Sequence, residues 1–129
     1  MPKQRILVVD DLPEKLRYLT GLTKSAQPES EVITATSARE AISIIAEQGR
    51  DQIDAGVIDF DLDNGRDGGD VIAKLRSTNT TACIALATAR RENSFEDEAK
   101  PIALHAGADE ALSTYQEDFE SRLSMMLAA

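Results

Sequence analysis

The chain has 129 residues, of which 42% are hydrophobic and 4% aromatic, and its 14 basic and 23 acidic side chains give a formal net charge of -9. This length predicts one domain spanning residues 1–129 with an aliphatic core. The negative charge disfavours a nucleic-acid partner and suits a cation or a basic protein. No apolar run could span a bilayer, no signal peptide precedes the first strand, and Cys83 has no partner for an intrachain disulfide, so we expect a cytoplasmic protein without a membrane partner.

The first half of the chain predicts three strands separated by two helices. Continuous apolar runs at Ile6–Val9, Val32–Ala35 and Ala55–Ile58 are typical of strands buried on both faces of a parallel sheet. Asp11 is the expected N-cap of the first helix, because an early proline, an acidic residue and leucines at helical spacing follow it. A capping box that starts at Ser37 predicts the beginning of the second helix.

The second half continues this alternation. We expect a helix at Gly69–Arg76 and strands at Ala82–Ala87 and Ala111–Ser113. The charged stretch Thr88–Lys100 predicts a long loop or a weak helix, and Pro101–His105 predicts a better helix that stops before a glycine. A second capping box starts at Thr114 and predicts the last helix.

Five alternations of strand and helix predict a doubly wound α/β fold, with a five-stranded parallel sheet covered by helices on both faces. In the strand order 2-1-3-4-5, ligands bind outside the carboxyl ends of the strands, between strands 1 and 3. Asp10 and Asp11 follow the first strand, Asp59 follows the third, and Thr88 ends the fourth. With that order, these four side chains converge on one rim of the sheet.

The side chains at this rim indicate a metal site. Three neighbouring carboxylates repel one another, so the pKa of each rises unless a cation neutralises them. Carboxylate oxygens suit Mg²⁺ or Mn²⁺ that keeps several waters. A carboxylate beside such an ion can be phosphorylated, because the metal offsets the charge on the incoming phosphoryl oxygens. Thr88 is placed to donate a hydrogen bond to one of those oxygens.

Four motifs of the chain, RILVVDD, VIDFDLDNGRDGGDVI, IALATAR and HAGADEAL, carry a family resemblance. Together they resemble the receiver domains of two-component response regulators, chemotaxis regulators among them, which have a flavodoxin-like (βα)5 fold. The resemblance spans residues 5–127. It implies that Asp59 is the phospho-acceptor and a metal ligand. It further implies that Asp11 binds the metal directly, Asp10 binds it through water, and Asp61 binds it through its backbone carbonyl.

The resemblance also implies a signalling role. Thr88 would be the switch hydroxyl, and Ala89 the small residue that leaves the phosphoryl group accessible. A histidine kinase or a histidine phosphotransfer protein would supply the phosphoryl group, and a downstream protein would receive the signal. The domain would catalyse only its own phosphorylation and dephosphorylation, so we do not expect a conventional enzyme.

The chain departs from the family pattern at the fifth strand. Receivers usually carry a lysine there, followed by a cis-proline, whereas this chain has Thr114 and Tyr115 and no lysine after Lys100. The nearest candidate for a substitute cation is Arg90. We expect its guanidinium to reach a phosphoryl oxygen or to pair with Asp61 in the resting state.

The missing lysine keeps a second hypothesis open. In it the chain is a pseudo-receiver, a protein-interaction module whose Asp59 is not phosphorylated. The acidic pocket argues against this hypothesis, because clustered carboxylates without a ligand only cost stability.

The acidic loop admits two weaker interpretations. Asp59, Asp61, Asp63 and Asp70 match positions of a calcium-binding EF-hand loop, but Asn64 stands where the sharp turn needs glycine. The sequence from Asp59 to Asp61 also resembles the start of haloacid-dehalogenase-like phosphatases, in which the first aspartate is a nucleophile. That motif normally lies on the first strand, whereas Asp59 follows the third. We therefore expect neither a calcium loop nor a phosphatase of this class.

Overall fold

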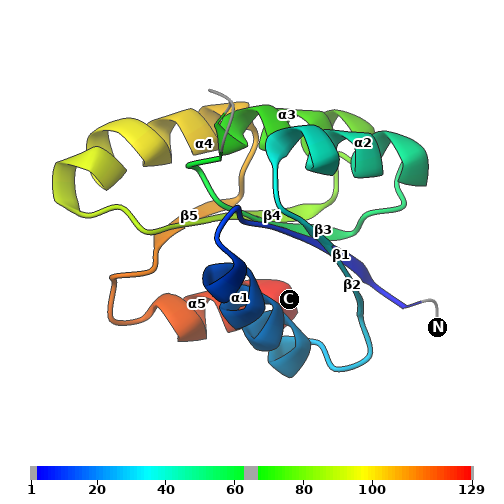
Figure 1. The fold of residues 1–129 in the computed structure, drawn as a ribbon, viewed down its shortest axis with the longest axis horizontal. Coiled ribbons are helices and arrows are strands. Elements are labelled where there is room, and N and C mark those ends of the chain that lie inside the picture. The colour runs from blue at the N-terminus through cyan, green and yellow to red at the C-terminus, as the bar shows by residue number, and fades with distance from the viewer. Residues whose placement is uncertain (1–2, 63–66, 129) are drawn as a thin grey trace.

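A computed structural model describes residues 3–62 and 67–128 of the chain (Figure 1). The strands are β1 (Arg5–Val9), β2 (Glu31–Ala35), β3 (Ala55–Ile58), β4 (Cys83–Thr88) and β5 (Glu110–Ser113). The helices are α1 (Pro13–Ala26), α2 (Ala38–Gln48), α3 (Gly68–Thr78), the π-helix η1 (Ser94–Ala99), α4 (Lys100–Ala106) and α5 (Phe119–Ala128). Among the described residues, no helix is long and apolar enough to cross a membrane.

The five strands form one sheet in the order β2-β1-β3-β4-β5, and every neighbouring pair is parallel, which confirms the predicted topology. The register pairs Val9 with Ile58, and Ile58 with Leu86. The carboxyl ends of β1, β3 and β4 therefore lie side by side. Residues that follow these three strands emerge at the same edge of the sheet.

Helices cover both faces of the sheet, with α2, α3 and α4 on one face and α1 and α5 on the other (Figure 1). Alternate residues of each strand face opposite sides, so β1 contributes Leu7 to the core under α2 and α3 and Val8 to the core under α1 and α5. Both side chains are fully buried. The apolar runs in the sequence are explained by this burial on two faces.

The connection from β1 to α1 differs from the prediction. Asp11 is not the N-cap: Leu12 occupies that position without a side-chain cap, and the helix begins at Pro13. Instead, the Asp10 Oδ1 atom accepts a hydrogen bond from the Leu12 N–H at 3.0 Å. An aspartate that bonds to the backbone two residues later sets a turn by itself. The Asp11 carboxylate is therefore not used for capping.

The two predicted capping boxes have different outcomes. Ser37 is the N-cap of α2, and its Oγ accepts a hydrogen bond from the Glu40 N–H, as predicted. Thr114 is not the cap of α5, which begins five residues later, at Phe119. The Thr114 N–H donates to the Thr88 carbonyl and so extends the β4–β5 pairing past the end of β5. The chain must therefore turn before the last helix can start.

The segment after β4 is more helical than predicted. The π-helix η1 runs directly into α4, so Pro101 lies inside a continuous helical segment rather than at the start of a separate helix. Lys100 donates its N–H to the Phe95 carbonyl, five residues earlier. Burial of Phe95 and Ala99 holds this wider turn against the core. As predicted, the helix ends at a glycine, Gly107, whose φ is +121°.

Candidate acidic site at the carboxyl edge of the sheet

The structure brings three carboxylates together at the carboxyl edge. Asp10 follows β1 and Asp59 follows β3, and their exposed fractions are 0% and 3%. Asp11 is half-buried beside them. One carboxylate oxygen from each residue lies within 4.8 Å of the others, a spacing that a single metal ion can bridge. The Asp61 carboxylate does not belong to this group.

The backbone of Asp59 is held from two sides. Its N–H donates to the Val9 carbonyl at 2.9 Å, which continues the β1–β3 pairing. On the other side Gly68, the first residue of α3, packs so closely that a Cβ there would lie 2.1 Å from the Asp59 carbonyl oxygen. Only glycine permits this approach. This positioning role of Gly68 was not predicted, although the paired glycines after the acidic loop are a signal for it in the sequence.

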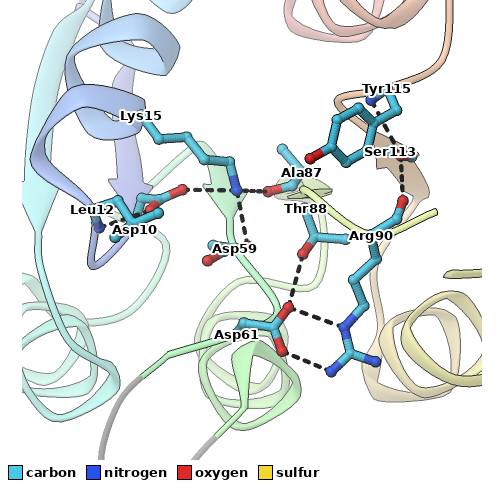
Figure 2. Close-up of polar contacts among 10 residues, drawn as sticks. All are labelled: Asp10, Leu12, Lys15, Asp59, Asp61, Ala87, Thr88, Arg90, Ser113 and Tyr115. Atoms are coloured by element: carbon cyan, nitrogen blue, oxygen red, sulfur yellow. Dashed lines mark hydrogen bonds and ion pairs between the residues drawn. The ribbon is translucent and has the colours of Figure 1, made fainter. Parts of the chain in front are cut away.

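A lysine that the sequence analysis missed enters the site from α1 (Figure 2). The Lys15 Nζ atom lies 3.0 Å from Asp10 Oδ2 and 3.1 Å from Asp59 Oδ1. It also lies 3.4 Å from the Ala87 carbonyl near the end of β4. Its side chain is 14% exposed. The sequence offered little signal, since a lysine in the first turn of a helix is most often solvated.

One buried oxygen in the site lacks a hydrogen bond. No described residue donates one to Asp10 Oδ2, although the Lys15 ammonium lies 3.0 Å away. We regard this contact as an attraction between charges without hydrogen-bond alignment. A buried carboxylate oxygen without a donor is costly in a protein but well suited to a metal ion, which needs no donor geometry. The residues at this edge therefore fit Mg²⁺ or Mn²⁺.

Burial raises the pKa of Asp59 to about 6. The Lys15 ammonium opposes this shift and lowers the pKa, whereas the nearby Asp10 charge raises it further. Near pH 6 and without a metal, the Asp59 carboxylate is therefore close to its titration midpoint. A second cation in the pocket would favour the ionised form, which is the nucleophilic one.

A second group of contacts surrounds Asp61 (Figure 2). Arg90 donates to both of its carboxylate oxygens, from Nη2 at 2.7 Å and from Nε at 3.0 Å. This ion pair, predicted as one of two arrangements for Arg90, holds the pKa of Asp61 below its usual range. The same guanidinium lies 3.0 Å from Glu98 Oε1 and 4.7 Å from the centre of the Phe60 ring. The buried Thr88 hydroxyl donates to Asp61 Oδ2 at 3.4 Å.

The residues around the end of β4 and β5 complete the rim. Ala89 follows Thr88 and is exposed. The Ser113 hydroxyl donates to the Arg90 carbonyl, which ties β5 to this loop. Tyr115 is exposed, and the Arg91 guanidinium lies 3.8 Å from the centre of its ring. None of the described contacts from β5 brings a positive charge to Asp59.

Replacing Asp59 with asparagine should stabilise the metal-free protein at neutral pH. The pKa of Asp59 is higher in the folded chain than its ordinary value of 3.8, so the folded state loses stability as the pH rises from about 4 to about 6. The loss persists above that range. Asp59→Asn should therefore raise the free energy of unfolding by about 2 kcal/mol at pH 7.5 and by almost nothing at pH 4.

Urea unfolding in EDTA at the two pH values measures this difference. Asp97→Asn removes an exposed carboxylate from η1 and is the matched control. An equal gain from both variants, or an equal gain at both pH values, would contradict the prediction.

Comparisons with a protein family and with solved structures agree with the fold described above. The sequence model of one protein family, the response regulator receiver domain, matches residues 6–117 of the chain. The chain is similar to the solved structure of a response regulator receiver domain protein from Clostridium thermocellum, at 22% identity and a TM-score of 0.76, covering 96% of this chain and 90% of that one. It is also similar to a CheY-like receiver domain protein from Methanospirillum hungatei, at 20% identity and a TM-score of 0.76, with coverages of 98% and 94%.

A third similar structure is the receiver domain of a sensor histidine kinase from Pseudomonas aeruginosa, which has a magnesium ion coordinated in its active site cleft. The identity is 21%, the TM-score 0.72, and the coverages are 98% of this chain and 95% of that one. No curated protein sequence matches the chain. Identities this low support the fold alone, but the family model covers most of the chain. The chain therefore belongs to the response regulator receiver domain family of two-component signalling.

Proposed function

We propose that this receiver domain accepts a phosphoryl group on Asp59, with Mg²⁺ or Mn²⁺ held by Asp10, Asp11 and Asp59. The observation that carries the proposal is the convergence of these three carboxylates within 4.8 Å at the carboxyl edge of β1 and β3. When bound, the ion supplies positive charge that offsets the charge of the phosphoryl oxygens. The Asp61 carbonyl is the remaining protein ligand that the family resemblance implies.

The chain's own residues account for the chemistry of the transfer. An ionised Asp59 oxygen attacks the phosphorus of a phosphohistidine, an oxygen–phosphorus bond forms, and the bond from phosphorus to the histidine nitrogen breaks. The leaving imidazole keeps the electron pair of the broken bond and takes a proton from water. The Thr88 hydroxyl, which now bonds to Asp61, is placed to donate to a phosphoryl oxygen instead. The small, exposed Ala89 leaves the donor room to approach.

The partners follow from this chemistry. A histidine kinase or a histidine phosphotransfer protein supplies the phosphoryl group, and a downstream protein binds the phosphorylated domain. The net charge of -9 suits basic protein surfaces and disfavours nucleic acid. We place this signalling in the cytoplasm, where such kinases deliver phosphoryl groups. The domain acts only on its own phosphorylation state and turns over no other substrate, so we do not class it as an enzyme.

The pseudo-receiver alternative rests on the absence of a lysine from the end of β5. The buried Asp10 Oδ2 atom without a hydrogen bond weighs against it. A pocket that never bound a metal ion would keep three carboxylates together with only the Lys15 ammonium to offset their charge. The calcium-loop interpretation is not supported, because a strand rather than a helix precedes Asp59. Two residues on which it depends, Asp63 and Asn64, lie outside the described residues.

Small phosphodonors should phosphorylate Asp59 and no other residue. Incubation with acetyl phosphate or phosphoramidate and Mg²⁺ should add one phosphoryl group, detected by intact-mass measurement. Hydroxylamine should remove it, because an acyl phosphate is labile to this nucleophile. Asp59→Asn should take up none, whereas Asp97→Asn should behave as the wild type does. A wild-type protein that no donor modifies would establish the pseudo-receiver instead.

Divalent metal binding should depend on the three converging carboxylates. We expect modest affinity for Mg²⁺ and Mn²⁺, because the protein supplies few ligands and the ion keeps several waters. In calorimetric titrations, Asp11→Ala and Asp59→Asn should each weaken binding by roughly tenfold or more. Asp70→Asn changes an exposed carboxylate of α3, which would be a ligand only in a calcium loop, and should have no effect. Loss of binding in Asp70→Asn alone would revive the calcium loop.

Arg90 should contribute to phosphoryl transfer from outside the metal pocket. Arg90 and Thr88 both donate hydrogen bonds to Asp61, so the guanidinium lies near the Thr88 hydroxyl. From this position the guanidinium can turn toward a phosphoryl oxygen. Arg90→Ala should slow phosphorylation by about tenfold, as expected for one charge-assisted hydrogen bond. The control is Arg91→Ala, since the neighbouring Arg91 stacks on Tyr115 instead. Equal rates in the two variants would remove Arg90 from the site.

A further inference from the structure

We propose that Lys15 supplies, from α1, the active-site ammonium that β5 lacks. In the metal-free protein it pairs with Asp10 and Asp59, and after transfer it pairs with the phosphoryl group on Asp59. This inference rests on the proposed function and assigns a positively charged residue to the same site.

The ammonium lies where the three inner strands end (Figure 2). It donates a hydrogen bond to Asp59 Oδ1 at 3.1 Å and contacts Asp10 Oδ2 at 3.0 Å. Its third partner is the Ala87 carbonyl at 3.4 Å, one residue before Thr88. One ammonium therefore contacts a group of β4 and the residues that follow β1 and β3. A group at this point contacts the phospho-acceptor and the residue that precedes Thr88 on β4.

Helix α1 holds the base of this side chain in place. The helix begins with Pro13 directly after the Asp10 turn, so Lys15 lies in the first turn, at the edge of the pocket. Further along the helix, Leu19 is fully buried against the core shared with α5. A helical backbone packed on the core and a side chain that is only 14% exposed place the ammonium at the rim.

The other nearby cation is already engaged. Arg90 binds both oxygens of Asp61 and also pairs with Glu98. Among the ion pairs between described residues, only that of Lys15 reaches Asp59. At the end of β5, Thr114 contributes its backbone N–H to the Thr88 carbonyl. The positive charge beside the phospho-acceptor therefore comes from α1.

This position has a consequence for metal binding. The ammonium pairs with Asp10 and Asp59, two of the three carboxylates that the divalent ion requires. Two cations repel each other and share these carboxylates, so a divalent ion binds against the charge of Lys15. Once negative phosphoryl oxygens are present, the two cations no longer compete, because both have an anionic partner. Lys15 thus disfavours the metal alone and favours the metal together with a phosphoryl group.

Two binding measurements on one set of variants test this assignment. Lys15→Met removes the charge and keeps an unbranched helix-forming side chain. Lys24→Met makes the same change at an exposed position in the last turn of the same helix and is the matched control. Calorimetry measures Mg²⁺ binding, and fluorine NMR measures binding of beryllofluoride with Mg²⁺, a mimic of the phosphoryl group on aspartate.

Lys15→Met should bind Mg²⁺ about tenfold more tightly and beryllofluoride about tenfold more weakly than the wild type, because one charge opposes the first ligand and attracts the second. Lys24→Met should change neither affinity. Lys15→Arg, which keeps the charge, should return the Mg²⁺ affinity to within about threefold of the wild type. If Lys15→Met folds poorly, Lys15→Gln should give the same two opposite shifts.

An Mg²⁺ or a beryllofluoride affinity in Lys15→Met equal to that of Lys24→Met would overturn the assignment. If the wild type binds both ligands in that case, the proposed function stands and only the role of Lys15 fails. A wild-type protein that binds Mg²⁺ but no beryllofluoride would overturn the proposed function and the assignment together.

Discussion

Asp10 and Asp59 are buried side by side at the carboxyl edge of a parallel sheet. The other polar contacts at this edge depend on how the negative charge of these two carboxylates is neutralised. The fold itself brings the two carboxylates together, because parallel pairing places the ends of β1 and β3 next to each other. Burial raises the pKa of Asp59, and the Asp10 charge adds to the shift. A positive charge must therefore enter the pocket, and in this structure it is the Lys15 ammonium.

Positive charge is divided between two sides of the site. Lys15 reaches the inner carboxylates from α1, whereas Arg90 binds the outer Asp61 from the loop after β4. Through Glu98, the same Arg90 side chain is connected to the π-helix η1. Its backbone carbonyl accepts a hydrogen bond from Ser113 of β5. The charged contacts of the site therefore extend to α1 as well as to the β4–β5 edge.

Two helix caps were predicted wrongly, because other hydrogen bonds compete with the capping patterns in the sequence. Asp11 and Thr114 both looked like helix caps, since each precedes residues typical of a helix start. Asp10 sets the first turn instead, through its bond to the Leu12 N–H. Thr114 is drawn into the β4–β5 pairing through the Thr88 carbonyl. The Thr88 carbonyl lies on a neighbouring strand, which a local pattern does not contain, whereas the Asp10 bond is itself local and replaces the predicted cap.

The sequence by itself determined the alternation of strands and helices, the parallel sheet, and the placement of Asp10, Asp59 and Thr88 at strand ends. Apolar runs and short acidic stretches encode these features locally, and strand order then brings the ends together. Only the tertiary structure decided which cation meets Asp59 and how Gly68 permits the close approach of α3. Those contacts join residues more than eight positions apart, and their distances depend on how the helices pack on the sheet.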